Sequence, residues 1–389
     1  MRTLLVFLLA TLPCLAAPSD RAGYLGARLA DTESGVKLSS IVPDSPAAKA
    51  GLKDGDVVVG AGPLADFLAR LRKARAGDKL ELEVLRDGAH SKITVTLGVH
   101  PRVLLEQPDT STGMQEVRVT RDLVYALGEG KPHARHKVNL FEPVTDKPFP
   151  VVLWIHAGAW SYGDRSNETA LAMRFAERGI GFAAINYRLS SQFWNDPTAA
   201  KEGVKHPAHA DDCAMAFAWL RKRYPQSALF VSGHSCGAHL AALLAMDPRY
   251  LKRHELALDE IRGVVAIGGA YDMVKYHAAL AGDDGLGKAK ADAHLNWIFG
   301  EGQKAWIEAS PATYLKGCTM PMIIVGEKGQ GMRIYHEDFR SAVKAAGVSS
   351  IEFLEADDRT HAQSTQLMSR KSSDPVRDRM IEFIRKRSQ

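Results

Sequence analysis

The chain has little of what defines several classes of protein. Its 389 residues contain only four cysteines, too few for a disulfide-rich scaffold. The net charge is a mild +5 and no basic run exceeds three residues, so nucleic-acid binding is not expected. No internal repeat or low-complexity tract is present. A hydrophobic content of 46% and a charged content of 24% describe an ordinary globular chain, whose length predicts two or three domains.

The apolar run at the start of the chain, Leu4 to Leu12, follows the basic residue Arg2 and is too short to span a bilayer. Leu15-Ala16-Ala17 then offers small residues for cleavage. We therefore interpret residues 1–17 as a signal peptide and the protein as exported, periplasmic or secreted, with no integral membrane segment after cleavage. Two alternatives stay open: an uncleaved anchor on the outer side of the membrane, and a lipoprotein modified at Cys14, which its preceding residues disfavour.

Residues 22–101 form a candidate domain. Residues 36–58 read VKLSSIVPDSPAAKAGLKDGDVV and, with residues 23–27, resemble a bacterial PDZ domain of the kind attached to exported proteases. The resemblance implies a small, mostly β domain in which Leu25, Gly26 and Ala27 form the peptide-binding loop, whose N–H groups hold a peptide C-terminus while the peptide adds a strand to the sheet. Residues 79–97 alternate around Asp87-Gly88, which predicts a hairpin.

The segment between Val59 and Phe67 is shorter than is usual for PDZ domains, so a purely structural role is the alternative to peptide binding. Residues 102–117, with a proline, a glycine and small polar residues, are expected to be a linker. They lead to a second domain at residues 118–389.

The most informative motif of the second domain is Gly233-His234-Ser235-Cys236-Gly237. It follows the apolar run 228–231, which predicts a strand, and precedes residues 238–246, which predict a helix. A G-x-S-x-G sequence between strand and helix is typical of a nucleophile elbow, in which the serine lies on a strained turn and the helix N-terminus faces a developing oxyanion. Ser235 is therefore the candidate nucleophile.

Two further segments have the pattern that this chemistry needs. The strand-like run 151–155 leads into HAGAW at 156–160, which is similar to the loop that supplies a second oxyanion donor in esterases. We expect the backbone N–H groups of Ala157, Gly158 and Cys236 to form the oxyanion hole. His361 follows the strand-like run 350–354, where the general base is expected.

These ordered motifs, from about residue 120 to 387, resemble the α/β-hydrolase superfamily. The closer resemblance is to the branch that includes feruloyl-esterase-like, kynurenine-formamidase-like and hormone-sensitive-lipase-like enzymes, and it also rests on His136–Phe141, Asn186–Arg188, His206–Asp212 and Ala309–Pro311. The resemblance implies a doubly wound, mostly parallel eight-stranded sheet with helices on both faces. The alternation of apolar runs with helical segments independently predicts a parallel α/β sheet.

The acid that should orient His361 departs from the family pattern. Relatives carry an aspartate in a Gly-Glu-x-Asp setting after the strand matching 322–325, and this chain has Gly329 in its place. We favour Glu327, at the correct strand end, over the alternative acid Asp272, which is also suited to capping a helix. A weakened dyad or Asp338 stays open.

The sequence thus predicts a serine esterase that cleaves small-molecule carboxylic esters through an acyl-enzyme, with no cofactor and no metal. An arylformamidase-like amide hydrolase is one alternative. Another is an inactive hydrolase fold whose PDZ-like domain binds peptide termini. The histidine pairs His206/His209 and His133/His136 lack a converging ligand set.

Substrate selectivity is expected to lie in two segments over the strand ends, Ser190 to Lys205 and Lys275 to Glu308. Four large apolar residues of the second segment could line an acyl pocket, and the core is the favoured place for each: Trp297, Ile298, Phe299 and Trp306.

Overall fold

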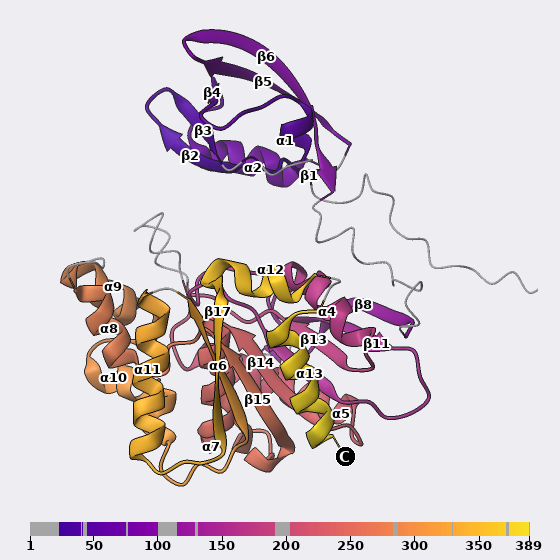
Figure 1. Cartoon of the computed structure of the whole chain (residues 1–389), viewed down its shortest axis with the longest axis vertical. Coiled ribbons are helices and arrows are strands. Elements are labelled where there is room, and N and C mark those ends of the chain that lie inside the picture. Colours follow the sequence, from indigo (N-terminus) through magenta and orange to yellow (C-terminus); the bar gives the residue numbers. More distant parts are fainter. Residues whose placement is uncertain are drawn as a thin grey trace, which may run out of the picture. The chain divides into compact units, whose positions relative to one another are not determined.

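The computed structural model describes residues 23–39, 41, 45–74, 77–99, 115–128, 131–190, 203–282, 287–328, 330–370 and 373–388. The expected signal peptide, most of the expected linker and residues 191–202 of the first selectivity segment lie outside the described residues. The chain divides into two compact units, Met1–Leu104 and Leu105–Gln389 (Figure 1). No helix in the described ranges is both long and apolar enough to cross a membrane.

The first unit is built on a five-stranded antiparallel sheet in the order β2-β3-β4-β5-β6. Its elements are β1 (Gly23–Tyr24), β2 (Arg28–Thr32), β3 (Gly35–Ser39), α1 (Pro46–Lys49), β4 (Val57–Val59), α2 (Leu64–Lys73), β5 (Lys79–Arg86), β6 (Ala89–Thr96) and β7 (Gly98–Val99). The predicted hairpin is confirmed: β5 pairs with β6, and Asp87 and Gly88 both have positive φ, as a tight two-residue turn requires.

The expected peptide-binding loop lies between β1 and β2. The carbonyl of Leu25 accepts a hydrogen bond from the amide of Ala47, and the hydroxyl of Ser45 donates to the carbonyl of Gly26. Gly26 has φ of +85°, and a Cβ there would lie 2.2 Å from Ser45 Cβ. The loop is thus fixed against α1, and β2 beside it is an edge strand among the described strands of this sheet.

The second unit contains the predicted eight-stranded sheet, in the order β17-β16-β15-β14-β12-β13-β11-β8 (Figure 1). Its strands are β8 (Val117–Val124), β11 (Lys137–Pro143), β12 (Val151–Ile155), β13 (Gly181–Ile185), β14 (Leu229–His234), β15 (Ile261–Ile267), β16 (Met322–Lys328) and β17 (Ile351–Thr360). The strands from β17 to β13 are parallel, and β11 is antiparallel to both of its neighbours. Two short strands, β9 (Leu127–Gly128) and β10 (Lys131–Pro132), form a separate antiparallel pair.

Helices cover both faces of this sheet, and every residue of its central strands β12, β13 and β14 is buried. Along β12, Val151, Leu153 and Ile155 belong to one buried cluster, and Val152 and Trp154 belong to a second on the other face. Residues of α5 (Ala208–Arg223), α6 (Cys236–Met246) and α11 (Gln330–Ala345) complete the first cluster, and residues of α4 (Thr169–Ala176) and α13 (Pro375–Arg387) complete the second. Such two-sided burial is characteristic of parallel sheets.

The remaining helical elements lie between or after the strands: η3 (Arg165–Glu168), α7 (Pro248–Lys252), η5 (Leu258–Glu260), α8 (Met273–Ala281), α9 (Lys288–Phe299), α10 (Gln303–Glu308), η6 (Pro311–Tyr314), η7 (His361–Gln363) and α12 (Ser364–Met368). The second selectivity segment runs from α8 to α10. Ile298, Phe299 and Trp306 are buried in the core there, as favoured, and Trp297 is half-buried under Lys205.

Four fully buried histidines make the second unit sensitive to acid. Burial lowers the pKa of His156 and His294 to about 4 and of His209 and His239 to about 3, from an ordinary value of 6.5. Between pH 6.5 and 4 the unfolded chain therefore binds protons that the folded chain does not, and stability falls as the pH falls. Below pH 6.5 each histidine lowers the free energy of unfolding by about 1.4 kcal/mol per pH unit. The four together therefore lower it by about 8 kcal/mol at pH 5.

A loss of this size is comparable to the whole stability of a typical domain. We expect the second unit to unfold between about pH 6 and pH 4. Urea unfolding followed by near-ultraviolet circular dichroism at pH 7.5, 6 and 5 measures this directly. Equal unfolding midpoints at pH 7.5 and pH 5 would show that the buried rings are not held neutral.

Candidate active site

The G-x-S-x-G sequence forms a sharp turn between β14 and α6. Ser235 has φ of 58° and ψ of −123°, a conformation that residues other than glycine rarely adopt. The two flanking glycines are required by close backbone packing. A Cβ at Gly233 would lie 2.5 Å from the backbone of Gly237, and a Cβ at Gly237 would lie 2.1 Å from the carbonyl oxygen of Ile155. The turn thus holds Ser235 at the carboxyl end of the central strand.

His361 contacts Ser235 from the end of β17, and Glu327 contacts His361 from the end of the adjacent strand β16. His361 directly follows β17, and Glu327 is the penultimate residue of β16. Ser235 Oγ lies 3.0 Å from His361 Nε2, and His361 Nδ1 lies 2.5 Å from Glu327 Oε2. Because the strands are parallel, their carboxyl ends share one edge of the sheet, which is where open α/β sheets place their sites. The three residues form one continuous hydrogen-bonded chain.

The strand before His361 is longer than its apolar run suggested. β17 continues through Asp358 and Arg359 to Thr360, with an irregularity in its pairing between Glu327 and Lys328 of β16. Thr360 then caps the short helix η7, together with the side chain of Gln363. This reciprocal cap fixes the turn that carries His361.

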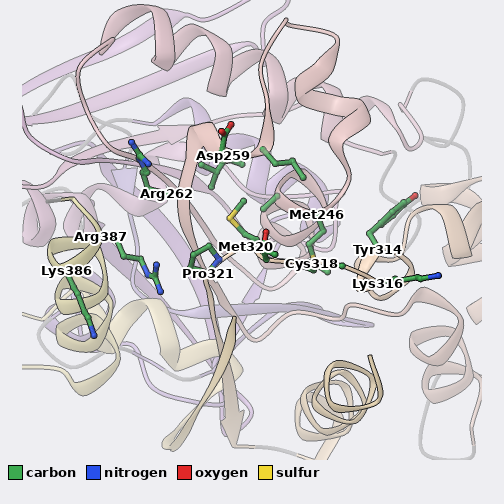
Figure 2. Close-up of a pocket in the computed structure, with 15 residues that line it drawn as sticks. Met246, Asp259, Arg262, Tyr314, Lys316, Cys318, Met320, Pro321, Lys386 and Arg387 are labelled. Carbon is green, nitrogen blue, oxygen red and sulfur yellow. The ribbon is translucent and has the colours of Figure 1, made fainter. Parts of the chain in front are cut away.

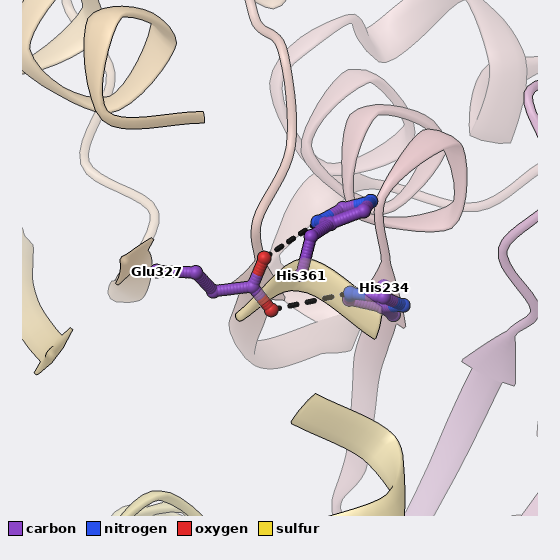
Figure 3. A group of neighbouring side chains, drawn as sticks. All are labelled: His234, Glu327 and His361. Atoms are coloured by element: carbon purple, nitrogen blue, oxygen red, sulfur yellow. Dashed lines mark hydrogen bonds and ion pairs between the residues drawn. The ribbon is translucent and has the colours of Figure 1, made fainter. Parts of the chain in front are cut away.

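The carboxylate of Glu327 is 3% exposed and accepts hydrogen bonds at both oxygens. Oε2 faces His361, and Oε1 lies 3.2 Å from His234 Nε2 (Figure 3). Oε1 also accepts a hydrogen bond from the hydroxyl of Ser364. Burial alone would raise the pKa of Glu327, but the bonds to His234 and His361 outweigh burial and lower this pKa to about 2. Glu327 is therefore ionised at neutral pH.

The other candidate acids lie elsewhere. Asp272 is the N-cap of α8, and its Oδ1 accepts from the amides of Val274 at 3.0 Å and Lys275 at 3.1 Å. Asp338 pairs with the ammonium group of Lys275 at 3.1 Å. The structure thus brings Glu327 to His361, and it engages Asp272 in the helix-capping role that its sequence position also suited.

The expected oxyanion loop has an unusual backbone. Gly158, Ala159 and Trp160 all have positive φ, and a Cβ at Gly158 would lie 2.3 Å from the carbonyl oxygen of Tyr162. The side chain of His156 contacts the backbone of this loop, because its Nδ1 lies 2.7 Å from the carbonyl oxygen of Ala157. Its Nε2 lies 3.1 Å from the guanidinium group of Arg135. Since His156 is neutral, Nδ1 donates and Nε2 accepts.

Cys236 lies under this loop at the start of α6. Its thiol is 3.3 Å from the hydroxyl of Tyr187, and burial raises the pKa of the thiol. A buried neutral thiol is inert as a nucleophile. Its backbone N–H is at the first position of the helix, where no carbonyl of the same helix can accept it, so it remains available as a donor.

Three residues of the site were not found from the sequence: His234, Ser364 and Arg135. His234 occupies a variable position of the G-x-S-x-G pattern, and its place directly before the candidate nucleophile was the only signal that the sequence offered. Ser364 follows His361 by three residues, a spacing that places both side chains on one face of a helical turn. Arg135 is distant in sequence from the loop that it supports, and no pattern indicated it.

The only group of potential metal ligands found in the described ranges is His234, Glu327 and His361, whose ligand atoms lie within 4.8 Å of one another. These are the side chains of the hydrogen-bonded cluster, and Glu327 is already shared between both rings. The histidine pairs weighed from the sequence have other contacts. His206 lies 3.2 Å from the hydroxyl of Tyr250, and His209 lies 3.0 Å from that of Ser190.

A cavity of about 590 Å³ lies away from this site, beside the starts of β15 and β16 (Figure 2). Four cationic side chains and Asp259 surround an apolar floor that includes Met246 and Met320; the cations are Arg262, Lys316, Lys386 and Arg387. The hydrogen-bonded residues Ser235, His361, Glu327, His234 and Ser364 form what we call the Ser235 cluster. None of them lines this cavity, so it is not the place where a substrate would meet Ser235.

Comparison with known proteins agrees with this geometry. The BD-FAE family profile matches residues 139–334, about half of the chain, and the PDZ domain profile matches residues 23–97. Kynurenine formamidase avaC of Aspergillus versicolor is 33% identical over 147 residues, which cover 34% of this chain and 50% of that protein. A probable DegP-like periplasmic serine endoprotease of Pseudomonas savastanoi pv. phaseolicola is 41% identical over 76 residues, which cover 18% of this chain and 16% of that protein.

Among solved structures, esterase B of Lactobacillus rhamnosis superposes with a TM-score of 0.55 at 18% identity, covering 69% of this chain and 84% of that chain. The fold is therefore that of an α/β-hydrolase, preceded by a PDZ domain. The chain belongs to the BD-FAE family of α/β-hydrolase esterases. The chain spans about half the length of avaC and of a kynurenine formamidase-like hydrolase of Fusarium equiseti.

Proposed function

We propose that this protein is a carboxylic ester hydrolase that works through an acyl-enzyme on Ser235. The observation that carries the proposal is the unbroken hydrogen-bonded chain from Ser235 Oγ through His361 to the buried Glu327 carboxylate. Membership of an esterase family and the elbow conformation of Ser235 support it. A panel of p-nitrophenyl esters of increasing acyl length, assayed with the purified protein, tests the activity and ranks its acyl preference.

In the first half of the reaction, Ser235 Oγ bonds to the acyl carbon as His361 Nε2 accepts the hydroxyl proton. The carbonyl electron pair moves onto the oxygen, which the N–H groups of Ala157, Gly158 and Cys236 stabilise. Loss of one such donor typically costs about 3–4 kcal/mol in the transition state. The oxyanion then collapses, the ester bond breaks, and His361 returns the proton to the departing alcohol.

Water completes the cycle by the same path in reverse. His361 accepts a proton from water, the resulting oxygen bonds to the acyl carbon, and Ser235 leaves with the proton that His361 returns. Glu327 stays ionised throughout. It accepts a hydrogen bond from the Nδ1–H group of His361, which leaves Nε2 free as the base, and it stabilises the imidazolium that forms in each transition state.

Hydrolysis of an arylformamide is the second candidate, favoured by the similarity to kynurenine formamidase avaC and related proteins. The same residues serve, with an amine in place of the alcohol as leaving group. Comparing a phenyl ester with N-formylaniline under the same conditions separates the two substrate classes. Failure of a fluorophosphonate probe to label Ser235 would instead support an inactive hydrolase fold.

For the N-terminal unit we propose capture of a peptide C-terminus by Leu25, Gly26 and Ala27, with the peptide pairing along the edge strand β2. The protein as a whole is proposed to act after export, as the similarity to a periplasmic protease's PDZ region supports. The domain limits proposed are 1–17, 22–101, 102–117 and 118–389. The natural substrate is proposed to be a small-molecule ester.

Deleting residues 18–101 is expected to change turnover of a small ester by no more than about threefold, because the second unit contains the whole Ser235 cluster and its own core. Steady-state kinetics of the truncated and full-length proteins on one ester provide the measurement. A truncated protein that is insoluble or unfolded would show that the PDZ unit is needed to form the hydrolase core.

A further inference from the structure

A glutamate in the position of the acid needs more support than an aspartate would. Its side chain has one more rotatable bond, so holding its carboxylate at one place costs more conformational entropy. A carboxylate that contacts His361 through Oε2 alone could still rotate about its last bond. The position of Oε1 therefore determines how well Glu327 is held.

Oε1 has two partners in the structure, and both come from the site itself. The hydroxyl of Ser364, at the start of α12, donates a hydrogen bond to Oε1. His234 Nε2, at the end of β14, lies 3.2 Å from the same oxygen (Figure 3). His234 is 6% exposed, and its ring lies against that of His361 with centroids 4.4 Å apart. His234 thus touches both the acid and the residue that carries the base.

The ring of His234 is suited to this role only when it is neutral. Burial lowers its pKa below the ordinary value of 6.5, against the opposing effect of Glu327. Because Glu327 is ionised, the proton of the neutral ring lies on Nε2 and is donated to Oε1. A charged ring would compete for the carboxylate and repel the imidazolium of His361, whereas a neutral ring orients the carboxylate without either effect.

We propose that His234 is a positioning residue of the hydrolase: by donating to Glu327 Oε1 it fixes the carboxylate so that Oε2 meets His361 Nδ1. This inference rests on the proposed function, since it concerns the same Ser235 cluster. His234 does not touch the reacting atoms. It acts through Glu327. By holding the longer glutamate side chain in place, it allows a glutamate to orient His361 as a shorter aspartate would.

Three substitutions separate the hydrogen bond from the packing of the ring. The amide nitrogen of glutamine is the same number of bonds from Cα as Nε2 of histidine, and that of asparagine is one bond closer. All three variants, His234→Gln, His234→Asn and His234→Leu, lose the ring, but only His234→Gln can still donate to Oε1. We expect His234→Leu and His234→Asn to lower kcat about 10- to 100-fold with KM nearly unchanged, the size of one hydrogen bond to a charged group. His234→Gln is expected to recover most of this loss.

His336 provides a matched control, because it is also a buried histidine whose Nε2 bonds to a glutamate, Glu355, at 3.0 Å. The hydrogen-bond partners of its Nε2 are Glu355 and Arg340 and include no residue of the Ser235 cluster, so His336→Gln and His336→Leu are expected to leave kcat within about twofold of the wild type. A general effect of losing a buried histidine would lower both series equally.

Proton NMR of the imidazole groups gives a reading that does not need turnover. The short bond between His361 Nδ1 and Glu327 should give a strongly deshielded Nδ1 proton, which moves upfield in His234→Leu and His234→Asn and returns in His234→Gln. If the wild type cleaves no ester through Ser235, the proposed function fails, and this resonance still decides the role of His234. Wild-type kcat and resonance in His234→Leu, or equal defects in all three variants, would overturn the inference.

Discussion

Replacing Ser235 with alanine is expected to reduce kcat on an aryl ester by at least about 10⁴-fold, because no other group in the site can form the acyl-enzyme. The adjacent thiol of Cys236 is buried and neutral, so it cannot substitute as the nucleophile. Ser235 Oγ has His361 as its hydrogen-bond partner in the cluster, and alanine accommodates the same backbone conformation about as well as serine. The stability of the variant should therefore lie within about 1 kcal/mol of the wild type.

The measurement is steady-state hydrolysis of p-nitrophenyl acetate, with fluorophosphonate labelling as a count of reactive serines. A preparation of Ser235→Ala made in the same host measures any contaminating esterase. Urea unfolding of both proteins at pH 7.5 serves as the control for folding. Wild-type turnover by Ser235→Ala, once host enzymes are excluded, would falsify the assignment of the nucleophile.

The fold and the positions of three candidate residues were within reach of the sequence, for a physical reason. The central strands are buried on both faces and consist mostly of apolar residues, so each stands out as a short apolar run. The ends of such strands share one edge of the sheet, and this brings together residues as distant as Ser235 and His361. The elbow adds its own local signal, since close packing excludes any side chain at Gly233 and Gly237.

The rest of the site depends on contacts that leave no local pattern. His234 is a variable position in its motif, and only the three-dimensional structure shows its ring beside Glu327. Arg135 supports His156 from a loop that is separated from it by two strands. The irregular pairing of β17 with β16 likewise depends on tertiary packing, so the apolar run at its start did not reveal where the strand ends.

The second large effect on kcat is expected from replacing the acid that orients His361. Glu327→Gln is expected to lower kcat by about 10² to 10⁴-fold, because an amide can donate to His361 Nδ1 and so favours the wrong tautomer, and it cannot stabilise the imidazolium. Asp272→Asn is expected to leave kcat within about twofold, since asparagine caps a helix about as well as aspartate. The matched pair changes one oxygen to nitrogen in each case, so neither variant creates a cavity.

Both variants should be compared with the wild type on the same ester across pH 7.5 to 9, where the buried histidines are largely neutral in the folded and in the unfolded chain. A kcat that falls for Glu327→Gln at every pH, with KM nearly unchanged, assigns the loss to the transition state. The opposite result, at least about a hundredfold loss for Asp272→Asn with Glu327→Gln near the wild type, would transfer the role to Asp272. It would also require the segment between β15 and α8 to move during catalysis, because in the present structure the Asp272 carboxylate is bound to the first turn of α8.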